Sequence, residues 1–188
     1  IFANRRAMYE TGQRLIALGH RRILFCVQQP NLSVTVERRQ GLNRAISEAP
    51  FPVAAHLLVC AGGEPAFVQQ IRQWLGSPQP PTAIIVSNSS LAAWIVRALQ
   101  ALKVPYPEQV SLLAFGEPEW ADLVTPQLSV VRQPTREIAV SAWELRLHRI
   151  KGQAAEPQRL ELEGVVVMRG SVGPPPSSPA PPRRRRHL

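Results

Sequence analysis

Short apolar runs alternate with helix-like segments along most of this chain, and that alternation restricts the possible folds more than any other feature. The clearest helical pattern is that of Leu91, Ile95, Leu99 and Leu102, whose spacings are four, four and three. Apolar runs without polar alternation are typical of strands buried on both faces. The pattern therefore predicts an α/β fold, a doubly wound parallel sheet with helices on both sides. The expected strands are 22–27, 56–60, 82–86 and 110–115. The expected helices are 5–18, 34–48, 65–75 and a fourth that is capped by Asn88 or Ser89.

The rest of the chain divides into a folded part and a tail. The folded part continues with a strand over 128–133, a helix over 134–150 and a final strand over 160–167. The apolar positions of that helix are Ile138, Ala142 and Leu145. Residues 173–188 hold six prolines and four arginines without apolar periodicity, a composition typical of disorder. We therefore predict a single domain over 1–172 and a disordered tail over 173–188.

The loops that follow the strands are where function is expected. In doubly wound sheets, ligands bind beyond the carboxyl ends of the strands. The loops at that edge are 28–33, 61–64, 87–90 and 116–120.

Metal sites and catalytic motifs are not predicted. The four histidines, His20, His56, His148 and His187, have no second ligand at metal-binding spacing. The sequence has no nucleophile elbow, P-loop or dinucleotide-binding glycine motif. The two cysteines, Cys26 and Cys60, lie in apolar runs, where thiols usually act as small buried side chains. We therefore expect neither an enzyme nor a bound cofactor, and a reducing cytoplasm as the compartment.

The net charge of +9 is concentrated at one end of the chain. Arg183–Arg186 carry four of those charges, and only two of the 22 basic residues are lysines. We interpret this arginine bias as the product of a GC-rich genome rather than as a nucleic-acid surface. The apolar runs are too short to cross a bilayer, and the first residues do not resemble a signal peptide. Because the chain starts without Met, we expect that residues upstream were removed or not included.

Several short motifs, taken in order over residues 4–171, resemble the effector-binding part of the lactose-repressor/galactose-repressor (LacI/GalR) family. The most typical run is Leu18-Gly19-His20-Arg21-Arg22-Ile23. The other matching segments are 38–46, 81–88, 110–115 and 124–134.

The resemblance implies a type I periplasmic-binding-protein-like fold, in which two lobes hinge around a small molecule, usually a sugar or nucleobase. This chain would hold the second lobe with an incomplete first lobe, to which residues 128–150 would return. It would bind a sugar-like effector and form a homodimer, and it would act on operator DNA through an N-terminal domain absent from this sequence. The implied function is allosteric control of a repressor. A transporter's solute-binding component shares this fold and is the alternative, and an enzyme on a doubly wound sheet is a further one.

The resemblance also assigns candidate ligand-binding residues. Arg38 matches an effector-contacting arginine of the family, and Asn88 matches its asparagine. Ser33, Glu117 and Trp120 lie in loops on the ligand side. Plainer interpretations are a solvated helix residue for Arg38, a helix cap for Asn88, a solvated carboxylate for Glu117 and a packing residue for Trp120.

The sequence departs from the family pattern at this site. Gly116 and Ser89 stand where the family usually has aspartates, and Trp94 stands where it has a small residue. An aromatic residue common in the family is also missing from 61–65. These departures leave the identity of the effector open, and with it whether the pocket binds one at all.

Overall fold

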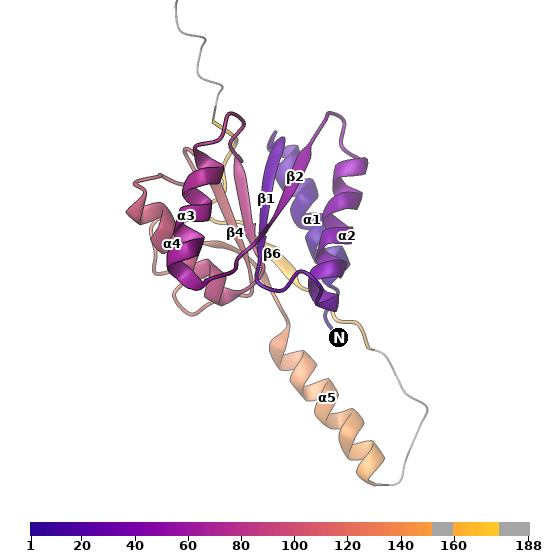
Figure 1. Ribbon diagram of the computed structural model, residues 1–188. Coiled ribbons are helices and arrows are strands. Elements are labelled where there is room, and N and C mark those ends of the chain that lie inside the picture. The colour runs from indigo at the N-terminus through magenta and orange to yellow at the C-terminus, as the bar shows by residue number, and fades with distance from the viewer. Residues whose placement is uncertain (152–159, 177–188) are drawn as a thin grey trace, which may run out of the picture.

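The computed structural model describes residues 1–151 and 160–176, which form a six-stranded sheet in the order β2-β1-β3-β4-β5-β6 (Figure 1). The strands are β1 Arg22–Val27, β2 Ala54–Val59, β3 Ala83–Val86, β4 Ser111–Phe115, β5 Ser129–Arg132 and β6 Val165–Val167. The helices are α1 Asn4–Ala17, α2 Ser33–Ser47, α3 Gly63–Leu75, α4 Ser89–Ala101 and α5 Thr135–Ile150. The predicted α/β fold is confirmed, since β1 to β5 pair in parallel.

The helices cover both faces of the sheet, with α1 and α2 on one side and α3 and α4 on the other (Figure 1). Successive side chains of one strand enter different cores. Leu24 and Cys26 of β1 pack in the core under α3 and α4. Ile23, Phe25 and Val27 pack in the core under α1 and α2. Burial on both faces therefore explains the unbroken apolar runs of the inner strands.

Two expected strands differ from the prediction. β2 lies at the edge of the sheet, and most of its residues are exposed or only partly buried. β6 is antiparallel to β5 and spans only Val165–Val167 of the predicted 160–167. Within that range, Leu162 instead forms an isolated bridge with Phe2. The chain's first residues therefore lie beside the segment that precedes β6.

The folded region extends past the predicted boundary at residue 172. The Gly173 amide donates a 3.0 Å hydrogen bond to Ser111 Oγ. The Gly173 carbonyl accepts hydrogen bonds from Ser111 Oγ at 3.0 Å and from His20 Nε2 at 2.9 Å. Gly173 thus belongs to the domain rather than to a disordered tail, because two partners from the sheet region satisfy its backbone. Residues 177–188 of the expected tail lie outside the described residues.

The buried ring of His20 makes stability depend on pH. Burial lowers its pKa, and the hydrogen bond to the Gly173 carbonyl opposes that shift. Because the folded state binds its proton less tightly than the unfolded state, the stability from neutral His20 is present above the unfolded pKa of about 6.5. That stability is lost as the pH falls through the folded pKa.

We expect urea unfolding to require less denaturant at about pH 5.5 than at about pH 7.5, where an unperturbed histidine is neutral. In His20→Gln, which keeps an amide donor for the Gly173 carbonyl, this dependence should be smaller. An equal pH dependence in both proteins would show that other groups cause it.

The helix α5 leaves the sheet and projects away from the rest of the domain (Figure 1). None of its residues is buried, and Ile138, near its start, only partly packs against the core under α1 and α2. β5, which the family resemblance also assigned to the returning segment, remains inside the sheet. Of the described residues in the predicted returning segment, α5 therefore leaves this lobe and β5 does not.

Candidate functional site

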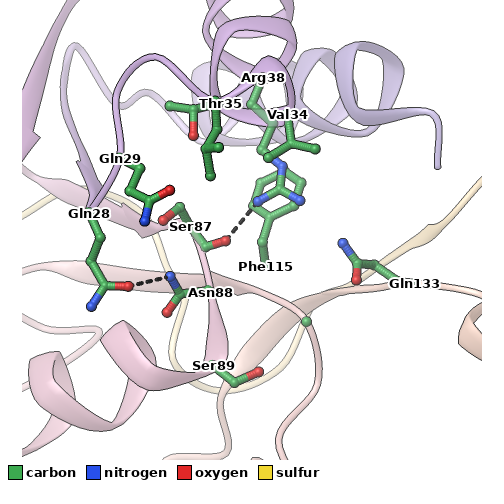
Figure 2. Close-up of a pocket in the computed structure, with 12 residues that line it drawn as sticks. Gln28, Gln29, Val34, Thr35, Arg38, Ser87, Asn88, Ser89, Phe115 and Gln133 are labelled. Atoms are coloured by element: carbon green, nitrogen blue, oxygen red, sulfur yellow. Dashed lines mark hydrogen bonds between the residues drawn. The ribbon is translucent and has the colours of Figure 1, made fainter. Parts of the chain in front are cut away.

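A cavity of about 360 Å³ lies at the carboxyl-terminal edge of the sheet, where loop function was expected. It is bounded by the loops after β1, β3 and β4 and by the first turns of α2 (Figure 2). Its lining residues are Gln28, Gln29, Leu32, Val34, Thr35, Arg38, Ser87, Asn88, Ser89, Phe115, Gly116 and Gln133. A cavity of this size fits a small molecule.

Arg38 forms part of the cavity wall and is held on three sides. It lies in the second turn of α2, and the residue is only 6% exposed. Its Nε donates to Asn4 Oδ1 and its Nη1 donates to the Ser87 carbonyl, both at 2.7 Å. The guanidinium lies over the Phe115 ring, 4.1 Å from its centroid (Figure 2). These contacts exclude the interpretation of Arg38 as a solvated helix residue and fix the direction of its remaining N–H groups.

Burial lowers the pKa of Arg38 to about 10, against the opposing effect of the neighbouring Glu37 carboxylate. The side chain is therefore still a cation at neutral pH. Its two hydrogen-bond acceptors, an amide oxygen and a backbone carbonyl, are both neutral. The cavity thus contains a fixed positive charge.

Asn88 joins two of the loops around the cavity. Its Oδ1 accepts a hydrogen bond from the Leu91 amide at 2.8 Å and so caps α4. Its Nδ2 donates to Gln28 Oε1 at 3.0 Å, which connects the loops after β3 and β1 (Figure 2). The predicted cap is therefore present, and the same amide also lines the cavity.

The backbone conformation at Gly116 accounts for the absence of the aspartate that the family usually has at this position. Its φ is +83°, a conformation that is strained for residues with a side chain. A Cβ at this position would lie 3.0 Å from Ser89 Oγ. Substitution with aspartate would therefore require both a strained backbone and a displacement of Ser89.

Glu117, expected on the ligand side, does not line the cavity. Its carboxylate forms ion pairs with Arg132 and Arg169. The hydrogen bond from Arg132, and after it that from Arg169, lowers the pKa of Glu117 to about 2. A carboxylate bound by two arginines does not substitute for the missing aspartate.

Two further candidates also lie outside the cavity lining. Ser33 is the exposed first residue of α2, whereas Thr35, in the same turn, is buried and lines the cavity. Trp120 packs against the core under α3 and α4, in agreement with its plainer interpretation. Sequence reasoning missed Gln28 and Gln29, although they directly follow β1 in a loop that it singled out.

Two searches of the described residues bear on other classes of function. Among residues 1–151 and 160–176, no group of three or more His, Cys, Asp and Glu side chains could hold a metal ion. None of the helices in those ranges has the length and apolar character needed to span a membrane.

Comparisons with known proteins agree with the fold and with the sequence motifs. The family described as periplasmic binding protein-like domain matches residues 13–172. A probable opine utilization operon repressor of Rhizobium rhizogenes is 32% identical over 178 residues, covering 90% of each chain. The HTH-type transcriptional repressor PurR of Vibrio atlanticus is 28% identical, covering 87% of this chain and 49% of that protein.

Solved structures show the same relationship. A LacI family transcriptional regulator from Enterococcus faecium, with bound ribose, matches with a TM-score of 0.82 at 23% identity, covering 92% of this chain and 64% of that one. A putative ribose operon repressor from Burkholderia thailandensis matches with a TM-score of 0.75 at 27% identity, covering 89% of this chain and 61% of that one.

These similarities decide between the classes that the sequence left open. The chain spans most of the Rhizobium relative but only about half of several other curated relatives. The named relatives are transcriptional repressors, which favours a regulator over a transporter component. The chain belongs to the LacI/GalR family of transcriptional regulators and corresponds to its periplasmic-binding-protein-like, effector-binding part.

Proposed function

We propose that this chain is the effector-binding and dimerisation part of a cytoplasmic transcriptional repressor, and that its effector is a sugar or a related small molecule. DNA contact would come from a separate head domain. The observation that carries the proposal is the buried Arg38 cation, fixed in the wall of a small polar cavity beside Asn88. Relatives that regulate ribose operons, and the ribose-bound structure, support a sugar-like ligand.

The cavity offers the chemistry that a hydroxyl-rich ligand needs. Arg38 supplies donors that are fixed in direction, because Asn4 and Ser87 hold its guanidinium. Within the described residues its Nη2 has no hydrogen-bond partner and is therefore available to a ligand. The amides of Gln28, Gln29 and Gln133 can each donate and accept. We expect such a site to bind its ligand without turning it over, as the repressor relatives suggest.

Binding would act on transcription through a shift in populations. A ligand held between this lobe and a facing one favours one angle between them over others. The coupling free energy between ligand binding and DNA binding equals the difference between the ligand's binding free energies for the two lobe arrangements. Residues that touch the ligand in only one arrangement would therefore set the response.

We expect Arg38→Ala to weaken binding of the preferred ligand by about tenfold to a hundredfold, the usual value of hydrogen bonds to a charged group. The measurement is titration of pentoses, hexoses and sugar acids into the ¹⁵N-labelled chain, followed by amide chemical shifts. Arg39→Ala is the matched control, since Arg39 is exposed on the same helix and does not line the cavity. Tight binding that survives Arg38→Ala would place the site elsewhere.

A further inference from the structure

The described lining of the cavity carries a positive charge and no negative one. Of the lining residues that the structure describes, Arg38 is charged and the others are neutral, with amides and hydroxyls as their polar groups. No carboxylate is among them. A buried cation is costly unless an anion or a full set of hydrogen bonds compensates it. The cavity as described lacks that anion.

The nearby carboxylates do not supply it. Glu117 follows the cavity residue Gly116 in sequence, but Arg132 and Arg169 bind its carboxylate. The Glu37 carboxylate partly offsets the effect of burial on the pKa of Arg38, but its side chain lines a different groove, beside α1, and not this cavity. The position where the family usually places an aspartate is Gly116, whose backbone conformation disfavours one.

Two helices add to the positive potential. α2, of 15 residues, and α4, of 13 residues, both begin at the cavity, where Val34 and Ser89 line its wall. The N-terminus of a helix carries a partial positive charge and unpaired N–H groups, which favour an anion. These dipoles act in the same direction as the Arg38 charge.

We propose that the effector is a small organic acid of the sugar-acid type, whose carboxylate pairs with the Arg38 guanidinium. This proposal rests on the proposed function and narrows its ligand class. A planar guanidinium matches a carboxylate with paired hydrogen bonds. The free Nη2 and the second N–H of Nη1 are the donors. The amides of Gln28, Gln133 and Asn88 hold the neutral hydroxyls.

The test compares matched pairs of ligands that differ in one group. Galactose and galacturonate, and glucose and glucuronate, are titrated into the 188-residue chain, with chemical-shift mapping of the amides. The acid of each pair should bind at least about tenfold more tightly than its neutral partner, with shifts around residues 28, 88 and 116. Ribose 5-phosphate distinguishes a requirement for a carboxylate from a general preference for anions.

Two variants make the result specific to the cavity. Gln133→Glu places a carboxylate in the wall without removing the contacts of Arg38. It should lower the preference for each acid over its neutral partner about tenfold, because like charges repel while both ligands lose the same amide contact. Arg39→Gln removes one exposed charge from the same helix and should change the binding of neither.

The outcomes separate this inference from the function on which it rests. If neutral sugars bind in the cavity as tightly as their acids, the proposal of an anionic effector is overturned and the proposed effector-binding function is not. Tight binding of ribose 5-phosphate but not of the carboxylates would also overturn the sugar-acid class. No saturable shifts at the cavity with any probe would contradict both proposals.

Discussion

Replacing Gly41 with alanine is expected to destabilise the fold by about 1–3 kcal/mol, although alanine favours helix formation. Gly41 is buried in α2 where that helix crosses α1. A Cβ there would collide with the Arg5 carbonyl oxygen and lie 3.0 Å from the Tyr9 amide nitrogen. Both atoms are backbone, so no change of rotamer relieves the contact. The gain in helix propensity is about 1 kcal/mol, so the steric effect determines the sign.

The measurement is the free energy of unfolding from urea titration, compared with Gln40→Ala. Gln40 is the exposed neighbour of Gly41 on α2, and its replacement should change stability by less than about 0.5 kcal/mol. Moving α2 away from α1 would also displace Arg38, so ligand binding should weaken together with stability. A Gly41→Ala protein as stable as the wild type would show that the two helices separate at little cost.

The order of the elements could be predicted because each inner strand is apolar on both faces. β1, β3 and β4 are fully or almost fully buried, and their sequences show it directly. The direction of β6 could not be predicted, because an apolar run looks the same whether its strand is parallel or antiparallel. The ordering of Gly173 also escaped prediction, since it depends on partners 62 and 153 residues away in sequence, Ser111 and His20.

A residue's place in the cavity lining was predictable where its position on a helix determines its direction. Arg38 lies on a helix face that the start of α2 fixes, and Asn88 lies directly before α4. Glu117 is different, because a loop carboxylate turns toward its strongest partners. Those partners are Arg132 and Arg169, and the second is 52 residues away. No local sequence pattern reports such a pairing.

We expect the chain to self-associate through α5, and substitution of Trp143 with glutamate to make it monomeric. α5 stands apart from the sheet, and Val140, Trp143 and Ile150 are 49%, 60% and 69% exposed (Figure 1). With the partly buried Leu147, these side chains recur at spacings of three and four, which places them on one face of the helix. This face differs from the predicted one, and an exposed apolar stripe of this kind marks an interface. A second copy would supply an identical stripe, so we propose a two-fold dimer that would cover both.

Trp143→Glu should raise the dimer dissociation constant at least about thirtyfold, because a central tryptophan typically contributes more than about 2 kcal/mol to an interface. Sedimentation equilibrium over a range of concentrations measures it. Ala142→Glu is the matched control, since it adds the same charge at an exposed position about a third of a turn away, on the predicted face with Leu145. If Ala142→Glu dissociates the dimer and Trp143→Glu does not, the contact uses the predicted face instead. A wild-type chain that stays monomeric at micromolar concentration would contradict the dimer itself, and α5 would then need a different partner.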